Sequence, residues 1–338
     1  MEILENASLR EFNTFGIDAK AAKLSSFFSA ADLKEILQNK ELRKMERLIL
    51  GGGSNVLLTK DFEGLVLKNE VPGIELIQED DEFYYVRSGA GENWHKFVLK
   101  CIENDWAGLE NLSLIPGNVG ASPMQNIGAY GVEVKDRFHE LEAFNLKTLE
   151  TEIFDAEACQ FGYRESVFKR QLKDKYIILS VTYRLFKTPQ LNTSYGAIQG
   201  ELNSLGIHKP TIKDVSDAVI RIRSSKLPDP KVIGNAGSFF KNPVVGNNIY
   251  QDIAKKHPEM PHYPAPMGQH KLAAGWLIEQ SGWKGFVRGT HGVHAKQALV
   301  LVNHGGATGN EIYSLSEEIL QDVKSKFGVE LEREVNII

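Results

Sequence analysis

The sequence predicts an α+β protein with more than one domain. A length of 338 residues is enough for two or three domains, and a composition of 42% hydrophobic and 25% charged residues is typical of a soluble globular enzyme. Apolar residues recur at helical spacing in some stretches and gather in short strand-like runs in others. The runs at residues 47–50 and 65–68 are joined through glycines and not through a helix, which argues against a dinucleotide-binding βαβ unit there.

The individual elements follow from these patterns in chain order. Thr211 and Asp214 have the spacing of a capping box, whereas Asn310 is expected to cap the last helix and Gly328 to end it. Helical spacing predicts helices over residues 29–39, 93–103, 211–223, 272–280 and 310–327. Apolar or alternating runs predict strands over residues 47–50, 65–68, 83–88, 140–144, 176–183, 298–302 and 329–338.

Composition argues against several classes of function. The net charge of −5 and the absence of a Lys/Arg tract disfavour binding to nucleic acid or to a membrane surface. Cys101 and Cys159 are too few for a disulfide framework. His291 and His294 flank a glycine and lack a third ligand nearby, so no metal site is expected. The acidic N-terminus and the lack of a long apolar run predict a cytoplasmic protein.

Two glycine-rich segments are candidates for binding a large ligand with a phosphate middle. Gly51-Gly52-Gly53-Ser54-Asn55 follows a short strand, and its backbone N–H groups could form an anion-binding nest; a plain hairpin turn explains the residues equally well. The second segment, 116–131, is too long and too poor in acidic residues for a simple turn. Its interleaved apolar residues favour contact with a buried partner over a bare surface loop.

A third small-residue segment, 234–243, contains Ser238 before a Phe-Phe pair. Gly, Asn and Ser are ordinary turn residues, so a turn leading into buried aromatics is one reading. The preceding segment, 226–231, holds two prolines and two lysines and leads directly into the glycines. A rigid basic lead-in to an open turn favours an anionic ligand.

Two charged residues elsewhere could join such a site. Arg164 follows a tyrosine and precedes a glutamate, and it is either in a surface ion pair or a clamp for a planar oxyanion. In the terminal run the apolar residues share one face, and Glu330, Glu332 and Glu334 share the other. Three carboxylates on one face are typical of a solvated edge, although one near the chain end could be catalytic.

These segments together resemble a known family, the flavin-dependent UDP-N-acetylenolpyruvoylglucosamine reductases of bacterial cell-wall precursor synthesis. The resemblance is carried, in order along nearly the whole chain, by the segments 13–16, 51–55, 116–131, 162–166, 226–243 and 331–335. It implies a vanillyl-alcohol-oxidase/PCMH-type FAD-binding region over residues 1–225, divided near residue 70. It further implies a family-specific α+β substrate domain over 226–328 and a terminal strand, 329–338, that carries Glu334 back to the active site.

The resemblance also implies roles for individual residues. Ser238 would donate a proton to the enolpyruvyl carbon, while Arg164 and Glu334 would stabilise the enolate formed after hydride arrives from non-covalently bound FAD, with NADPH as hydride donor. Residues implied to bind FAD are Gly51, Gly52, Gly53, Ser54, Asn55, Pro116, Gly117, Gly120, Ser122, Asn126, Ile127, Gly128 and Gly131. Residues implied to bind the nucleotide-sugar substrate are Tyr195, Lys226, Asn242, Tyr263, Lys284 and Gln297.

Tyr263, between prolines in an apparently unstructured span, resembles the tyrosine of the mobile loop that marks the longer type of this family. Two residues depart from the family pattern: Arg333 stands where proline is frequent, and Asn336 where arginine is frequent. A monomer is expected. Two rival functions remain, a sugar or alcohol oxidase of the same fold and a nucleotide-sugar binding protein without chemistry. Against the first, neither glycine segment contains the His or Cys that often tethers flavin in such oxidases.

Overall fold

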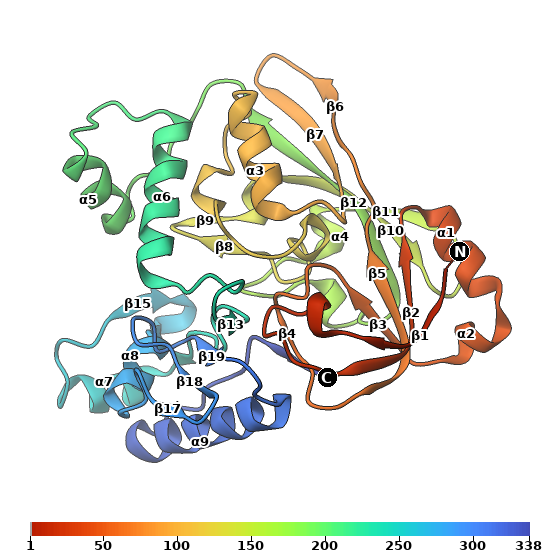
Figure 1. Cartoon of the computed structure of the whole chain (residues 1–338). Coiled ribbons are helices and arrows are strands. Elements are labelled where there is room, and N and C mark those ends of the chain that lie inside the picture. Colours follow the sequence, from red (N-terminus) through yellow and green to blue (C-terminus); the bar gives the residue numbers. More distant parts are fainter. Residues whose placement is uncertain (1) are drawn as a thin grey trace. The chain divides into compact units, whose positions relative to one another are not determined.

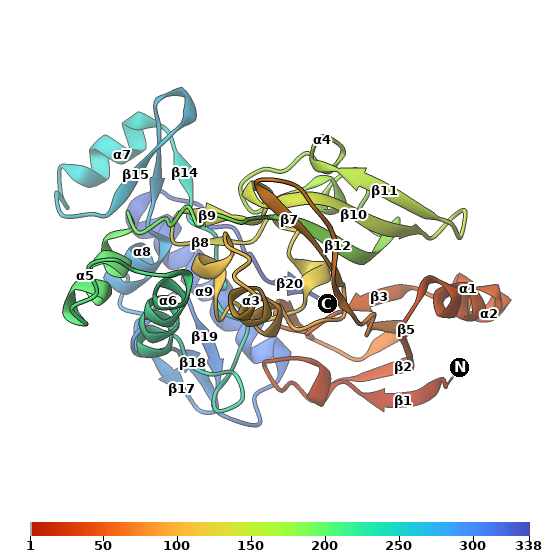
Figure 2. The ribbon, with the colours of Figure 1, turned by 90° about the horizontal axis from the view of Figure 1, so that it is seen from above.

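The computed structural model (Figures 1 and 2) describes residues 2–338. The chain folds into two compact units. Unit 1 comprises the chain up to Asn6 and residues 22–52 and 63–225, whereas unit 2 comprises residues 7–21, 53–62 and 226–338. Both units mix helices with mainly antiparallel sheets, which confirms the predicted α+β class. No helix among the described residues is long and apolar enough to cross a membrane.

The larger sheet of unit 1 has the strand order β11-β10-β12-β7-β6, with antiparallel pairing throughout. The helix α3 (Trp94–Glu103), capped by Asn93, packs Trp94, Phe97 and Val98 against this sheet. The strands are β6 (Ile74–Glu79), β7 (Phe83–Gly89), β10 (Phe138–Asn145), β11 (Thr151–Asp155) and β12 (Tyr176–Phe186). The predicted helix and the strands at 83–88, 140–144 and 176–183 are therefore confirmed; β6 was missed because its side chains are mostly exposed and show no alternation.

A second sheet has the order β1-β2-β5-β3, and its strands β3 and β5 are parallel, with Arg47 opposite Leu65. Parallel neighbours cannot be joined by a hairpin turn, so the hairpin reading of residues 51–55 is wrong. The strands are β1 (Leu4–Ser8), β2 (Lys20–Phe27), β3 (Arg47–Leu50) and β5 (Phe62–Asn69). Figure 2 shows the predicted helix α1 (Ala30–Gln38), followed by α2 (Lys40–Lys44), beside β3 and β5, where Leu33 and Leu37 join the core.

Two helices follow the large sheet in unit 1 and pack on each other through small and branched apolar residues. Figure 1 shows α5 (Gly196–Ser204) beside α6 (Ile212–Lys226). Thr211 and Asp214 form the predicted reciprocal cap, and the helix runs three residues past its predicted end at Arg223. The remaining elements of this unit are α4 (Ala156–Cys159) and the short hairpin of β8 (Gly128–Ala129) and β9 (Val132–Glu133).

Unit 2 contains a sheet of order β13-β19-β18-β17 that packs against a long helix. The helix α9 (Gly309–Phe327) lies along this sheet in Figure 1 and contacts β18, β19 and α8 (Ala274–Gln280). The strands are β13 (Gly234–Asn235), β17 (Val287–Arg288), β18 (His291–Val293) and β19 (Leu301–Asn303). A second sheet, of order β14-β16-β15, lies next to α7 (Asn247–Ala254) and is made of β14 (Val244–Val245), β15 (His262–Ala265) and β16 (Gln269–Leu272).

Several predictions for unit 2 are wrong in detail. Thr308, not Asn310, caps α9, because Thr308 and Glu311 form the capping box; Gly328 ends the helix as predicted. Only Leu301 and Val302 of the predicted strand 298–302 are in β19, since residues 298 and 299 form a turn. The Tyr263 span is not unstructured: Pro264 lies in the edge strand β15, where a missing N–H is tolerated.

The terminal run is less regular than predicted. It holds an isolated bridge at Arg333 and the short strand β20 (Asn336–Ile337), which pairs in parallel with β4 (Val56–Leu57). The alternation of faces is nevertheless as predicted, because Leu331 and Val335 are buried while Glu332 and Asn336 are exposed.

Candidate active site

The two predicted glycine nests lie against each other. A Cβ on Gly52 would come within 2.9 Å of the Gly117 Cα and 2.8 Å of the Asn118 Oδ1, so only glycine fits between these backbones. Gly51 faces the same residue at ordinary distance, since its Cβ would lie 3.6 Å from the Asn118 Cβ. The two nests were predicted as separate segments, and the structure brings Gly52 and Gly117 into contact.

The first nest continues in residues 53–62, which belong to unit 2. Gly53 has a φ of +62°, and its Cβ would lie 1.9 Å from the Phe12 carbonyl oxygen, so both conformation and space require glycine. The Thr14 N–H donates to the Gly53 carbonyl at 3.1 Å. The side-chain amide of Asn55 donates to the backbone carbonyl of Glu334 at 3.2 Å, which ties this nest to the terminal run.

The second nest is fastened to the chain that follows β7. The N–H groups of Val119 and Gly120 donate to the carbonyls of Glu92 and Ala90 at 2.9 and 3.0 Å, and the Trp94 N–H donates to the Gly117 carbonyl. A Cβ on Gly120 would lie 2.6 Å from that of Ala90. The small residues of this loop therefore let its backbone lie directly on its neighbours and hold it rigidly.

Two predicted cofactor-binding side chains are engaged by the protein itself. Ser122, which is buried, shares a hydrogen bond of 2.7 Å with the Tyr183 hydroxyl, and burial raises the pKa of that tyrosine. The fully buried Asn126 donates to Glu133 and to the Gly162 carbonyl, and accepts from the Lys135 N–H. These hydrogen bonds hold the loop in its shape.

Arg164 is held against the second nest. Its two terminal nitrogens donate to the carbonyls of Asn126 and Gly128 at 3.4 and 2.6 Å, and its guanidinium lies 5.3 Å from the Tyr163 ring. The backbone is unusual at this position, with a φ of +55° in the short turn between Gly162 and Glu165. Such strain in a non-glycine residue is frequent where a functional side chain must be aimed.

A partly buried arginine near this loop was not singled out from the sequence. Arg223 of α6 donates to the Leu114 carbonyl at 3.2 Å, and the hydroxyl of Tyr130 lies within its reach, while burial lowers the arginine's pKa and raises that of Tyr130. Tyr130 in turn meets the predicted substrate residue Tyr195 edge to face at 5.3 Å. Arginine on a helix is ordinary in sequence, so only the structure identifies this partly buried cation.

In unit 2, Ser238 is exposed between buried neighbours. β13 pairs with β19, Gly237 turns the chain with a φ of +68°, and the Phe239 N–H donates to the Leu299 carbonyl at 2.8 Å. Phe239 and Phe240 are almost fully buried, which confirms the reading of a turn that leads into buried aromatics. The turn leaves Ser238 exposed, and binding of an anionic ligand there stays a prediction.

The same segment is supported by the N-terminal motif at residues 13–16. The Thr14 hydroxyl donates to the Asn235 carbonyl at 2.7 Å, and the Asn235 N–H donates to the Thr14 carbonyl. Asn303 donates to the Phe15 carbonyl at 2.8 Å. The motif was visible in the sequence as a compact turn, but a partner 221 residues away leaves no local signal.

Glu334 is half-buried and lies next to the serine segment. Its N–H donates to the Phe239 carbonyl at 2.9 Å, and the Lys241 N–H donates to the Glu332 carbonyl at the same distance. Residues 239–241 and 332–334 thus pair antiparallel around the bridge between Phe240 and Arg333. This pairing places Glu334 beside the residue that follows Ser238.

The predicted substrate residues of unit 2 have varied surroundings. The Asn242 Oδ1 accepts the Ala274 N–H at the start of α8, and the Gln297 Oε1 accepts the Leu299 N–H. Lys284 forms an ion pair of 2.9 Å with Glu279, and Lys226 ends α6. Tyr263 is 46% exposed on β15 opposite Lys271 of β16, so its ring is available to a ligand.

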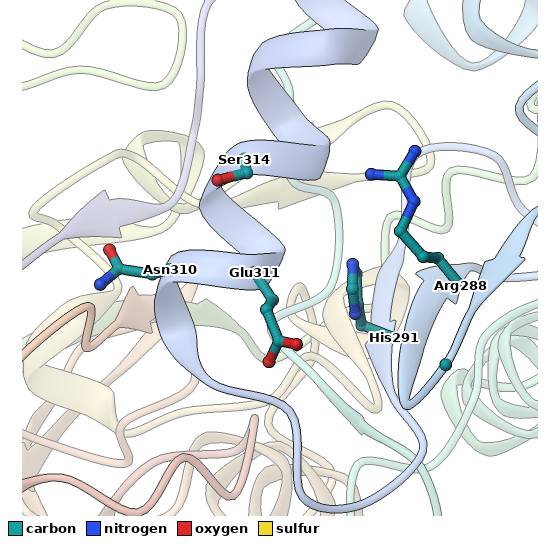
Figure 3. A pocket seen from close by; sticks show the side chains of 6 residues that line it. Arg288, His291, Asn310, Glu311 and Ser314 are labelled. Carbon is teal, nitrogen blue, oxygen red and sulfur yellow. The ribbon is translucent and has the colours of Figure 1, made fainter.

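An open pocket of about 340 Å³ in unit 2 contains none of these residues (Figure 3). It is lined by Arg288, Gly289, His291, Asn310, Glu311 and Ser314. Its charges are already engaged: Arg288 forms a two-pronged ion pair with Glu318, and Glu311 belongs to the α9 capping box. Among residues 2–338 no group of three or more His, Cys, Asp or Glu side chains could hold a metal ion.

Comparison with known proteins gives the context of these residues. Residues 27–148 match the model of an FAD binding domain, and residues 229–338 match that of the UDP-N-acetylenolpyruvoylglucosamine reductase C-terminal domain. The chain is 54% identical to UDP-N-acetylenolpyruvoylglucosamine reductase of Flavobacterium johnsoniae, with 100% of each chain covered. It is 51% identical to that of Amoebophilus asiaticus, again over 100% of both chains.

A relative of the same name from Pseudomonas aeruginosa is 49% identical over 100% of this chain and 99% of its own. Among solved structures, UDP-N-acetylenolpyruvylglucosamine reductase from Thermus caldophilus is similar, with a TM-score of 0.66 and 22% identity over 99% of this chain and 98% of that one. That likeness concerns the fold, and together with the FAD-domain match it confirms the predicted FAD-binding architecture.

Proposed function

The chain belongs to the UDP-N-acetylenolpyruvoylglucosamine reductase family, and from this premise we propose which of its residues carry out the reaction. The enzyme reduces the enolpyruvyl group of UDP-N-acetylglucosamine enolpyruvate to give UDP-N-acetylmuramate, a precursor of peptidoglycan, with NADPH as reductant. FAD, when bound, supplies the hydride transfer between the two substrates.

The glycine nests fit the demands of FAD. A pyrophosphate needs several backbone N–H groups within reach, and the close approach of Gly52 to Gly117 leaves no side chain in the way. We assign cofactor binding to residues 51–55 and to the loop 116–131, within a flavin region that spans residues 1–225. Because Ser122 and Asn126 are engaged internally, their part is to hold the loop in shape.

The remaining roles follow from the charge that develops during the reaction. A hydride that adds to one alkene carbon leaves negative charge on the side of the substrate carboxylate. Arg164, whose guanidinium is held by two carbonyls, stabilises this enolate together with Glu334. Ser238 then donates the proton that completes the reduction. The observation that supports this assignment is the backbone bond from the Glu334 N–H to the Phe239 carbonyl, which joins Glu334 to the segment that contains Ser238.

Substrate binding is assigned to residues whose side chains can meet a nucleotide diphosphate. Lys226, Lys284 and the amides of Asn242 and Gln297 offer charge and hydrogen bonds, and the exposed rings of Tyr195 and Tyr263 offer flat surfaces. We propose residues 226–328 as the substrate domain, with 329–338 as the segment that brings Glu334 to the substrate. A cytoplasmic protein that binds neither nucleic acid nor membrane completes the proposal, supported by the net charge, the acidic N-terminus and the lack of a long apolar run. A monomer is proposed without an observation that bears on it.

The role of Ser238 is tested by separating the two half-reactions in anaerobic stopped-flow absorbance. Ser238→Ala should leave flavin reduction by NADPH near the wild-type rate and slow reoxidation by the enolpyruvyl substrate by roughly 10²- to 10⁴-fold. Ser238→Cys should recover part of the loss, because a thiol still donates a proton. Ser204→Ala, at an exposed helix end, serves as the control. Equal slowing of both half-reactions by Ser238→Ala would make the serine structural.

A further inference from the structure

We propose that Arg333 is a positioning residue for Glu334: its side chain fastens the segment 331–335 to α9 and so fixes where the Glu334 carboxylate stands. The inference rests on the proposed catalytic role of Glu334. It concerns a residue to which neither the motifs nor the chemistry of the reaction assigns a part.

The backbone on both sides of Arg333 is paired with the serine segment. The Glu334 N–H donates to the Phe239 carbonyl and the Lys241 N–H donates to the Glu332 carbonyl, both at 2.9 Å. Both bonds of this bridge come from the neighbours of Arg333 and Phe240, so the N–H of Arg333 takes no part in it. The Glu334 carbonyl also accepts from the Asn55 amide, and two residues later β20 pairs with β4. None of these bonds joins the segment to α9.

The Arg333 side chain supplies a link to α9. Its Nε donates to the Ser316 Oγ at 2.9 Å, its Nη2 donates to the Glu317 Oε1 at 2.5 Å, and its guanidinium lies 4.7 Å from the centre of the Tyr313 ring. Ser316 is fully buried, and the Arg333 side chain is only 18% exposed. Because the planar guanidinium makes three contacts with one turn of α9, both the orientation of the Arg333 side chain and its distance from the helix are fixed.

The effect on Glu334 is one of geometry. Arg333 lies on the same face of the segment as the buried Leu331 and Val335, whereas Glu334 points to the other face, since successive side chains of an extended chain alternate. The charge of Arg333 is taken up by Glu317, and this arginine lowers the pKa of the Glu317 carboxyl. Because the Arg333–Glu317 ion pair is neutral and faces away from Glu334, we infer that Arg333 acts on Glu334 through the position of the backbone.

A matched pair of variants follows from this geometry. Arg333→Ala removes the restraint. Arg333→Pro also removes the three contacts but stiffens the backbone, because proline fixes φ near −65° and favours extended chain before it. The bridge uses no N–H at this position, so proline leaves its two bonds intact. The control is Glu330→Ala. Glu330 immediately precedes the segment 331–335 and forms an ion pair with Lys324 of α9, and both side chains are exposed, 75% for Glu330 and 63% for Lys324.

The experiment measures both half-reactions of each holoenzyme variant, with FAD content and thermal unfolding alongside. Arg333→Ala should slow flavin reoxidation by the substrate by roughly 10- to 100-fold, the effect of a displacement on the order of 1 Å, and leave reduction by NADPH within about twofold. Arg333→Pro should recover most of the lost rate, and Glu330→Ala should change neither rate by more than about twofold. A merely structural role would not be rescued by proline.

Dependence on Glu334 is tested in a double-variant cycle. In a Glu334→Ala background, Arg333→Ala should cause no further slowing, because the group it positions is gone. Further slowing by the full single-variant factor would overturn the inference, as would a wild-type reoxidation rate in Arg333→Ala. A wild-type rate in Glu334→Ala would instead refute the catalytic role of Glu334 and the inference with it. If Arg333→Ala does not fold, Arg333→Lys takes its place. Lysine cannot make the paired bonds of the guanidinium to Ser316 and Glu317, so Arg333→Lys should still slow reoxidation several-fold, and an unchanged rate would overturn the proposal.

Discussion

Replacing Gly52 by alanine tests whether contact between the two glycine nests is what makes FAD binding possible. The added Cβ would lie 2.9 Å from the Gly117 Cα, while ordinary contacts begin at 3.4 Å, so the two backbones must separate by 3.4 − 2.9 = 0.5 Å. Overpacking of this kind costs about 1–3 kcal/mol.

We expect this strain in Gly52→Ala to weaken the binding of FAD. The loop at Gly117 is held by bonds from Trp94, Val119 and Gly120, so we expect the turn at 51–55 to yield and the nests to part. A loss of about 1–3 kcal/mol corresponds to a rise of roughly 5- to 150-fold in the dissociation constant of FAD. The measurement is quenching of flavin fluorescence on titration of the apoprotein.

Gly51→Ala is the matched control, one residue away. Its Cβ would meet nothing closer than the Asn118 Cβ at 3.6 Å, an ordinary contact, and neither glycine has a positive φ. We expect Gly51→Ala to bind FAD within about threefold of wild type. FAD affinity that is unchanged in Gly52→Ala, or equally weakened in both variants, would refute the argument from nest contact.

Three further outcomes are expected. Arg164→Ala and Glu334→Ala should each slow substrate reduction by roughly 10²- to 10³-fold. The double variant should be little slower than either single variant, because the effects of groups that act as a unit do not add. If the two losses in activation free energy add in the double variant, the residues act separately. Tyr263→Phe should raise the substrate dissociation constant and leave FAD content unchanged, whereas Met267→Leu at the 97% exposed turn of the same hairpin should change neither. Equal substrate affinities of wild type and Tyr263→Phe in calorimetry would contradict the proposed role of Tyr263 in substrate binding. Burial raises the pKa of Glu110, so the folded state binds this proton more tightly than the unfolded chain does. The free energy of unfolding should therefore fall as the pH rises above the ordinary value of 4.5 towards the folded pKa. Glu110→Gln should remove this fall in urea unfolding measured from acid to neutral pH, and a fall that persists would belong to another group.

Helices and strands with a strong local signal were predictable from the sequence. The strand at 47–50 and the helix that Asn93 caps needed only apolar spacing and a capping residue. The last helix was placed correctly but its cap was not, because Asn310 is a good capping residue while the Thr308 and Glu311 pair forms the actual capping box. Local chemistry therefore sets the existence of an element more securely than its ends.

What could not be predicted depends on residues far apart in the chain. The contact of Gly52 with Gly117, the support of Asn235 by Thr14 and the pairing of Phe239 with Glu334 leave no periodic trace. The same holds for the terminal run, where alternation indicated a strand but the only regular pairing, with β4, covers two residues. The resemblance to a family indicates Ser238, Arg164 and Glu334 as candidates. It marks Arg333 only as a departure from the family pattern, and it does not single out Arg223.

The division of the chain has a consequence for the order in which the protein matures during synthesis. Residues 22–52 and 63–225 of unit 1 leave the ribosome with most of their own partners, whereas residues 7–21 and 53–62 belong to the unit that is made last. Thr14 must wait for Asn235, 221 residues later, and Asn55 for Glu334, 279 residues later. The boundary between the units falls inside the first nest, between Gly52 and Gly53. Asn55 of the first nest therefore gains its Glu334 partner only when the chain is nearly complete, and a C-terminally shortened chain should lack this support.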